Sequence, residues 1–200
     1  MQLIVTGADV ETTGFNAETG DRITEVAMLV YKYDTELRTF EQMGKLSTLI
    51  NPMRPIPLEV QRITNITPDT VKDSPTWDVI APKVSKVLAM TDVFIAHNAD
   101  FDSVFLAAEV NRLKLPLNYD MEVFCTMQNG RFATANGKFP RLEELCWALG
   151  VDFKAEDAHR AIYDTEKMML AVFAGIERKY YDLTTVFDNA AETKLKRGVK

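Results

Sequence analysis

The chain has 200 residues, 46% of them hydrophobic and 26% charged, which are the shares of an ordinary globular protein. No apolar run approaches the length of a membrane span, and the N-terminus lacks a basic segment followed by an apolar stretch, so we expect a cytoplasmic protein without membrane contacts. The net charge of −6 disfavours a protein that coats duplex nucleic acid through surface lysine and arginine.

Three strands are predicted in the first quarter of the chain. The apolar run in residues 2–10, the apolar centre of residues 22–33 and the less regular residues 37–50 all fit extended structure. Residues 16–21, which contain the breaker pair Gly20-Asp21, predict a turn between the first two strands.

Helices enter after this point. A proline-rich connection over residues 51–68 carries a short predicted helix near residues 58–63. A second helix is expected over residues 74–89, and we expect Pro82 to kink or split it because proline lacks an N–H group. The wholly apolar residues 93–96 predict a buried strand.

The second half of the chain alternates between helix and strand. Apolar spacing predicts a helix from Phe101 onward, with Val104 on its apolar face. Residues 121–125 predict another strand, and residues 142–149 a helix that ends at Gly150. Residues 162–180 predict the last long helix.

This order of elements indicates an α/β fold. Three consecutive strands followed by strands that alternate with helices predict a mixed sheet covered by helices. We expect a domain over residues 1–180 and a polar C-terminal tail over residues 181–200. The two cysteines, Cys125 and Cys146, belong to no CxxC pair and are expected as free, buried thiols.

Four carboxylates lie at positions that this fold would bring together. Asp9 and Glu11 are two residues apart at the end of the first strand, so their side chains point to the same face. Asp102 follows the buried strand, in the first turn of a helix, and Asp164 lies in the first turns of the last helix. Four acids in one cleft cannot stay ionised without cations, so the grouping predicts bound divalent metals.

His159 stands five residues before Asp164. Five helical residues turn by about 500°, which leaves the two side chains about 140° apart. We therefore expect His159 in the loop before the helix, where it reaches over the metals as a general base.

The motifs resemble those of the DEDDh 3′→5′ exonucleases of the DNA polymerase III epsilon (proofreading) type, in the ribonuclease H-like superfamily. Residues 9–14, 97–102 and 159–164 resemble the three exonuclease motifs, and the resemblance covers roughly residues 2–178. The tyrosine branch of the family would have tyrosine where Arg160 stands. Ala8 and Cys125 depart from the family pattern, but neither replaces a metal ligand or the base.

The resemblance implies a ribonuclease H-like fold, with a mixed five-stranded sheet flanked by helices. It implies two Mg²⁺ or Mn²⁺ ions held by the four carboxylates, with Asp9 bridging both. It also implies a site for the terminal nucleotide, with contacts from Thr12, Thr13, Gly14, Phe15, Asn98 and Phe101. For Phe15 and Phe101, packing within the fold is the alternative interpretation.

The implied activity is the release of nucleoside monophosphates from the 3′ end of single-stranded DNA, as a proofreading activity alone or with a DNA polymerase partner. An oligoribonuclease-like or RNase T-like enzyme that trims RNA 3′ ends is the first alternative, because the choice of sugar depends on contacts to one hydroxyl. The second is an inactive module that binds a polymerase or nucleic acid. Such modules have usually lost a ligand or the histidine, and all five residues are present here.

Residues 131–141 form a basic segment with interleaved aromatic residues, including Arg131, Phe132, Lys138 and Phe139. This composition suits the tracking of a single strand by charge and stacking. A solvated loop of ordinary composition is the alternative interpretation.

Overall fold

The computed structural model describes residues 1–186 of the chain. One mixed sheet lies at its centre with the strand order β3-β2-β1-β4-β5. The strands are β1 (Gln2–Thr12), β2 (Ile23–Asp34), β3 (Thr39–Leu49), β4 (Val93–Ala96) and β5 (Glu122–Cys125). β1, β2 and β3 pair antiparallel, whereas β4 lies parallel to both β1 and β5. The predicted α/β fold with a mixed five-stranded sheet is confirmed.

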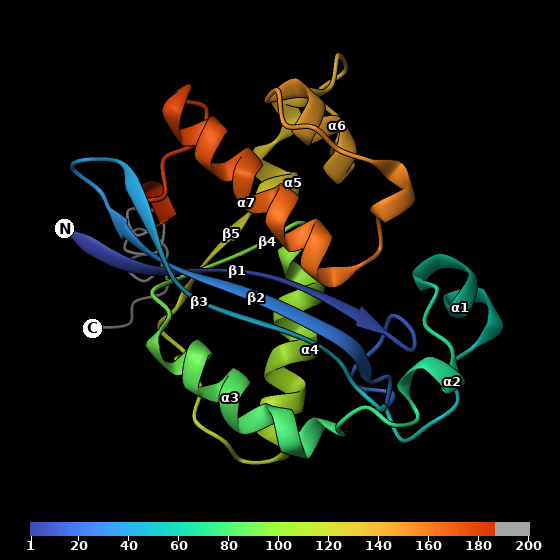
Figure 1. Ribbon diagram of the computed structural model, residues 1–200. Coiled ribbons are helices and arrows are strands. Elements are labelled where there is room, and N and C mark those ends of the chain that lie inside the picture. Colours follow the sequence, from blue (N-terminus) through green and yellow to red (C-terminus); the bar gives the residue numbers. More distant parts are fainter. Residues whose placement is uncertain (187–200) are drawn as a thin grey trace.

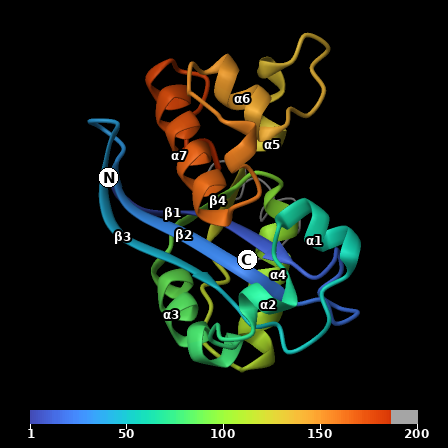
Figure 2. The ribbon, with the colours of Figure 1, turned by 45° about the vertical axis from the view of Figure 1, so that its right-hand side comes forward.

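Helices cover both faces of this sheet (Figure 1). On one side lie α5 (Thr126–Asn129), α6 (Leu142–Ala148) and α7 (Ala161–Glu177), and on the other side α3 (Trp77–Met90) and α4 (Ala99–Arg112). α1 (Leu58–Thr64) and α2 (Pro68–Val71) lie beside the end of β1, and the turned view of Figure 2 brings α1 forward. Short 3₁₀ turns occur at Arg131–Ala133 and Ala155–Asp157.

The sheet separates two apolar cores because successive strand residues point to opposite faces. On β2, Leu29 and Tyr31 pack toward α7, whereas Val26 and Met28 pack toward α3 and α4. β2 is therefore buried on both faces, which explains why its sequence is an almost continuous apolar run.

One helix prediction was wrong in its detail. α3 begins at Trp77, later than residue 74, and Pro82 does not split it. Pro82 lies near the start of the helix, so the hydrogen bond that it cannot donate would have gone to the carbonyl of Asp78. Asp78 is exposed, and water can satisfy that carbonyl group.

The predicted apolar face of α4 was also wrong at one position. Val104 is 52% exposed, whereas Phe105, Leu106 and Val110 are buried. The buried residues follow the three- and four-residue spacing that starts at Asp102, and this spacing leaves Val104 on the solvent side.

The predicted end of α6 is confirmed. Gly150 follows the helix with a left-handed φ of 69°, which glycine adopts without steric strain. Its N–H bonds to the carbonyl of Trp147, and the N–H of Val151 bonds to the carbonyl of Cys146. This pair of bonds is a Schellman motif, which satisfies carbonyl groups at the helix end. Cys146 and Cys125 are both buried free thiols, as expected.

Packing continues beyond the predicted domain boundary at residue 180. Tyr181 and Leu183 are buried in the core under α7, and Val186 packs against it. The remainder of the predicted tail, residues 187–200, lies outside the described residues. Within residues 1–186, no helix is both long enough and apolar enough to span a bilayer.

Met169 of α7 lies against Gly7 of β1. A Cβ atom added to Gly7 would lie 2.4 Å from Sδ and 2.6 Å from Cγ of Met169, which is closer than real contacts allow. We expect Gly7→Ala to lower the free energy of unfolding by about 1–3 kcal/mol, because the added methyl group overpacks this contact. Urea denaturation measures the loss. The matched control is Gly44→Ala on β3, where no described atom lies within 4 Å, and equal midpoints for the two variants would contradict the packing argument.

Candidate active site

The site begins at the end of β1. Asp9 and Glu11 lie inside this strand, which extends to Thr12, so their side chains share one face of the sheet. Glu25 of β2 lies directly opposite Glu11 in the antiparallel ladder and is buried. Residues paired in this way have side chains on the same face, so Glu25 joins the two predicted acids.

Asp102 reaches this edge of the sheet from α4. Its side chain is buried, and its Oδ1 accepts a hydrogen bond of 3.0 Å from the backbone N–H of Val10. Since Val10 lies between Asp9 and Glu11, this bond fixes Asp102 against the strand that carries both of them. The neighbouring Asp100 is exposed and accepts a hydrogen bond from Gln128, so the preference for Asp102 in the cleft is consistent with the structure.

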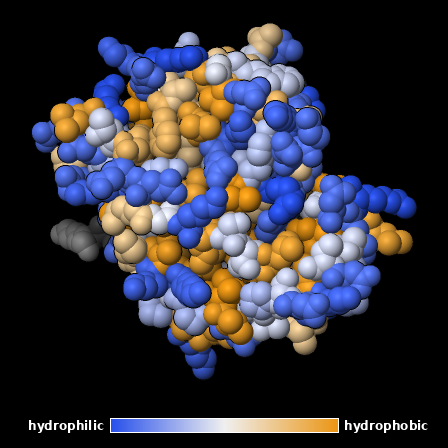
Figure 3. Space-filling view, in the orientation of Figure 1, coloured by the Kyte–Doolittle hydropathy of each residue, from blue (hydrophilic) through white to orange (hydrophobic). Residues whose placement is uncertain are grey.

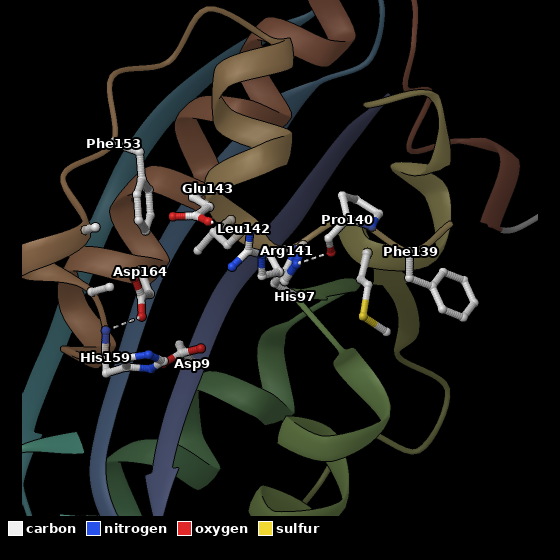
Figure 4. Close-up of a pocket in the computed structure, with 13 residues that line it drawn as sticks. Asp9, His97, Phe139, Pro140, Arg141, Leu142, Glu143, Phe153, His159 and Asp164 are labelled. Carbon is white, nitrogen blue, oxygen red and sulfur yellow. Dashed lines mark hydrogen bonds and ion pairs between the residues drawn. The ribbon is translucent and has the colours of Figure 1, made fainter. Parts of the chain in front are cut away.

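α7 supplies the fourth carboxylate, and the turn before it supplies the histidine. Asp164 lies in its first turn, and Oδ2 accepts a bond of 2.9 Å from the backbone N–H of His159. His159 precedes the helix, is exposed, and has a left-handed φ of 63°. Potential metal-binding atoms of Glu11, His159 and Asp164 lie within 4.8 Å of one another. Figure 4 shows His159 beside Asp9, with Asp164 directed toward both.

The electrostatics of the cluster follow from burial and like charge. Burial first, and then the neighbouring carboxylates, raise the pKa of Asp9 well above its usual value. The same causes raise the pKa of Glu11 to about 8. Burial raises the pKa of Asp102 to about 8 and that of Asp164 to about 6, although backbone hydrogen bonds oppose both shifts. Without bound cations, the surroundings of the cluster therefore disfavour the ionised form of these carboxyl groups.

The donor set fits a divalent cation. Oδ1 of Asp164 is buried and has no hydrogen-bond partner among residues 1–186, so one acceptor in the cluster is left for a ligand. Carboxylate oxygens are the ligands that hard cations such as Mg²⁺ prefer. Bound cations would also offset the mutual repulsion of the four acids.

Two cavities flank the cluster. The larger, of 530 Å³, contains Asp9, His159 and Asp164, and extends past His97 to Phe139, with further walls from α6 and Phe153 (Figure 4). The smaller, of 180 Å³, has Glu11 at one side. In the space-filling view, hydrophilic side chains gather in the middle of the molecule, where α7 begins (Figure 3).

Most residues predicted for the terminal nucleotide lie around the smaller cavity. Thr12, Gly14, Phe15 and Phe101 line it, and Phe15 is 84% exposed. The rings of Phe15 and Phe101 stand edge to face with centroids 6.4 Å apart. The opposite wall comes from α1 through Val60, Ile63 and Thr64, which the sequence analysis did not single out. No motif marked α1, so only the fold could reveal this wall.

Two predicted contact residues lie elsewhere. Thr13 is buried, and its hydroxyl donates to Asp21 Oδ1, which in turn pairs with Arg54 at 3.1 Å. Thr13 thus holds the loop that carries Phe15 instead of facing the cavity. Asn98 is exposed at the start of α4, in a left-handed conformation, and belongs to neither of the two cavities described above.

In the basic segment over residues 131–141, two of the basic side chains form ion pairs at the surface. Lys138 pairs with Glu144 at 3.4 Å, and Arg141 pairs with Glu143 at 3.0 Å. Phe132 stacks on Tyr180 with centroids 4.4 Å apart. Only the last three residues of the segment, from Phe139 to Arg141, line the larger cavity, and the guanidinium of Arg131 lies 4.0 Å above the Phe139 ring.

Glu25 is the acid that the sequence analysis missed. A signal was present, because Glu25 is the single charged residue in the otherwise apolar or uncharged residues 23–31. Burial raises its pKa, while the N–H of Ala161 and the guanidinium of Arg160 lower it. Its place opposite Glu11 depends on the strand register, which the sequence did not specify.

A mixed sheet that brings four carboxylates and a histidine to one cleft defines a nuclease of the metal-dependent class. The family model described as "Exonuclease" matches residues 6–172. The chain belongs to this family of DEDD-type 3′→5′ exonucleases, which are phosphodiester hydrolases that use divalent metals, and the predicted resemblance is thereby confirmed.

Among curated relatives, the chain is 35% identical over 168 residues to DNA polymerase III subunit epsilon of Treponema pallidum, covering 82% of this chain and 72% of that protein. It is also 35% identical over 159 residues to the PolC-type DNA polymerase III of Bacillus subtilis. That alignment covers 79% of this chain but 10% of the polymerase, so the chain spans only a small part of that relative.

Solved structures share the fold. The E. coli Exonuclease I–single-stranded DNA complex superposes with a TM-score of 0.74 at 18% identity, covering 94% of this chain and 43% of that one. Exonuclease X in complex with 5′-overhanging duplex DNA superposes with a TM-score of 0.64 at 22% identity, covering 92% and 98% of the two chains.

The raised carboxylate pKa values predict how stability depends on pH. A carboxyl group whose folded pKa lies above its unfolded value of about 4 stabilises fully below that value and loses its contribution as pH rises through the folded pKa. In EDTA, we expect the melting temperature to fall by several degrees from about pH 5 to about pH 8, at about 2–4 °C per kcal/mol. Mn²⁺ should restore the melting temperature at the higher pH.

Scanning calorimetry with and without Mn²⁺ measures this effect. Glu11→Gln removes the carboxyl group whose pKa is about 8, and it should flatten the fall. Glu156→Gln, at an exposed position before α7, is the matched control and should leave the fall unchanged. A melting temperature independent of pH and of Mn²⁺ would contradict the raised pKa values of the acidic cluster.

Proposed function

We propose that this exonuclease releases nucleoside monophosphates from the 3′ end of single-stranded DNA, or of a frayed duplex end, with two Mg²⁺ or Mn²⁺ ions. We further propose that it does so as a proofreading activity beside a DNA polymerase. The observation that carries the proposal is the convergence of the four carboxylates and His159 between two cavities, with one carboxylate oxygen left without a partner. The named relatives, a polymerase subunit and a polymerase, support DNA as the substrate.

The chain's own residues divide the work of hydrolysis. Asp9, Glu11, Asp102 and Asp164 would hold the two ions, and Asp102 is kept in place by its bond from Val10. The bound ions supply Lewis-acid stabilisation of the attacked phosphate and of the departing 3′ oxygen. The acids can hold these ions only when they are ionised, so metal binding and deprotonation of the cluster are linked.

His159 would accept the proton of the attacking water. Histidine can take up a proton near neutral pH, and His159 stands exposed at the mouth of the cleft beside Asp9. Its backbone N–H is fixed by Asp164, one of the proposed metal ligands. The base would therefore keep a constant position relative to the metal site.

The smaller cavity would hold the terminal nucleotide. Its walls are mostly apolar, with Phe15 and Phe101 on one side and Val60 and Ile63 of α1 on the other. Such walls contact the faces of any base through stacking and van der Waals contacts. The larger cavity, with the stacked Arg131 and Phe139 at its far end, would accept the strand that follows.

Digestion of 5′-labelled single-stranded DNA and RNA of matched sequence tests the function. We expect a ladder of shortening DNA products with Mg²⁺, none with EDTA, and none from Asp9→Ala. Preferential shortening of RNA would replace the DNA proposal by an oligoribonuclease-like or RNase T-like activity. A folded protein that shortens neither strand in the presence of Mg²⁺ or Mn²⁺ would leave only a binding function.

His159→Ala should separate the chemical step from metal binding. Loss of a positioned general base typically slows turnover by about 10²–10⁴-fold, so we expect a fall of this size in kcat. Mn²⁺ binding, measured by calorimetry without substrate, should persist in His159→Ala but be lost in Asp164→Ala. Unimpaired turnover by His159→Ala would refute the assignment of the base.

Phe15→Ala should weaken substrate binding. Stacking of a base on an aromatic side chain contributes about 1–3 kcal/mol, so we expect KM to rise by about 5- to 100-fold with a smaller change in kcat. Tyr119→Ala is the matched control, because Tyr119 is similarly exposed, at 78%, and lines neither cavity of the site. Steady-state kinetics on a short single strand give both constants, and equal KM values for the two variants would remove Phe15 from the nucleotide site.

A further inference from the structure

The turn that carries His159 is held at two backbone N–H groups by two carboxylates from different elements. The N–H of His159 donates to Asp164 Oδ2 at 2.9 Å, and the N–H of Ala161 donates to Glu25 Oε2 at 3.2 Å. Asp164 is part of the same helix as Ala161, but Glu25 belongs to β2. Glu25 therefore ties the histidine turn to the central sheet.

Glu25 is built into its position. Its side chain is 2% exposed, and its Oε1 lies 3.7 Å from Nε of Arg160. Ala161 is the first residue of α7, where a backbone N–H group has no partner within its own helix. Glu25 satisfies this group, and its negative charge at a helix N-terminus is favourable.

The turn needs such support because its conformation is unfavourable by itself. His159 has a φ of 63°, a region that residues with a side chain occupy at a cost of about 1–3 kcal/mol unless their surroundings hold them there. His159 is also exposed, so few side-chain contacts fix its ring. The hydrogen bonds at the N–H groups of His159 and Ala161 therefore restrain the backbone from which the imidazole projects.

We propose that Glu25 is a positioning residue, which acts through Ala161 and Arg160 to hold the imidazole of His159 over the acidic cluster. This inference rests on the proposed function, in which His159 is the base. It gives Glu25 a different role from the four carboxylates that would bind metal. Both Glu25 oxygens already face protein groups, Ala161 N–H and the Arg160 guanidinium, whereas Asp164 retains an oxygen without a partner.

The histidine rings themselves give a readout that needs no catalysis. The chain has two histidines, so a protein with ¹³C-labelled histidine gives two sets of ring signals, assigned by the loss of one set in His159→Ala. We expect Glu25→Ala to shift or broaden the His159 signals. The His97 signals are an internal control, because this ring is fixed by Thr126 at 3.0 Å and the Pro140 carbonyl at 3.1 Å.

Kinetics then show whether Glu25 acts through His159. Misplacement of a catalytic group by about 1 Å can cost up to about 10²-fold, so we expect Glu25→Ala to lower kcat by about 10- to 100-fold with KM changed less than about 3-fold. The double variant Glu25→Ala/His159→Ala should be no slower than His159→Ala alone, since the base that Glu25 positions is already absent.

Glu25→Gln keeps an oxygen that can accept the Ala161 N–H bond, so it should preserve the His159 signals and most of kcat even if Glu25→Ala proves poorly folded.

Any of three results would overturn the proposal: unchanged His159 signals in a folded Glu25→Ala, additive losses in the double variant, or loss of Mn²⁺ binding, which would make Glu25 a metal ligand. If the wild-type protein itself shortens no strand, the proposed function fails, and the ring signals still decide whether Glu25 holds the turn.

Discussion

The burial of several carboxylates beside one another at one edge of the sheet is the constraint on which the rest of this structure depends. Asp102 is buried, Asp9 and Glu11 are partly buried, and the pKa of each is raised, first by burial and, for Asp9 and Glu11, also by the neighbouring carboxylates. A fold can keep such a cluster only if the acids come from rigid elements that cannot move apart. β1 and the first turn of α4 provide this rigidity, because the Val10 N–H bond locks Asp102 to the strand. The stored repulsion is what a divalent cation relieves.

Much of this site could be predicted because it follows from regular geometry. Strand alternation places Asp9 and Glu11 on one face, and the rotation between residues of a helix removes His159 from the face of Asp164. A buried strand followed by a helix places Asp102 at the same sheet edge as the end of β1. Each of these inferences needs only one element, or a strand and the helix that follows it, and local sequence patterns specify both.

The features that escaped prediction depend on how separate elements meet. Glu25 joins the cluster because β2 pairs with β1 in a register that places it opposite Glu11, and a shift by one residue would turn it to the other face. The α1 wall of the smaller cavity depends on where the proline-rich connection folds back. Lys138 and Arg141 have a basic pattern in the sequence, but acids on α6 engage both of them. Contacts between separate segments leave no periodic signal in the sequence.

Under the proposed function, the two cavities would separate nucleotide binding from the chemical step. The chemical groups are fixed by strands, helix ends and the Glu25 contact, whereas the smaller cavity is closed by a loop that Asp21 and Arg54 hold and by a short helix from the connection. Its mainly apolar walls can contact any base, but they have few groups to read base edges. An enzyme that must remove whichever nucleotide stands at a 3′ end gains from this indifference. The enzyme would then discriminate among 3′ ends by whether they are free to enter the smaller cavity. A base-paired end must first unpair and unstack, whereas a frayed end is already free.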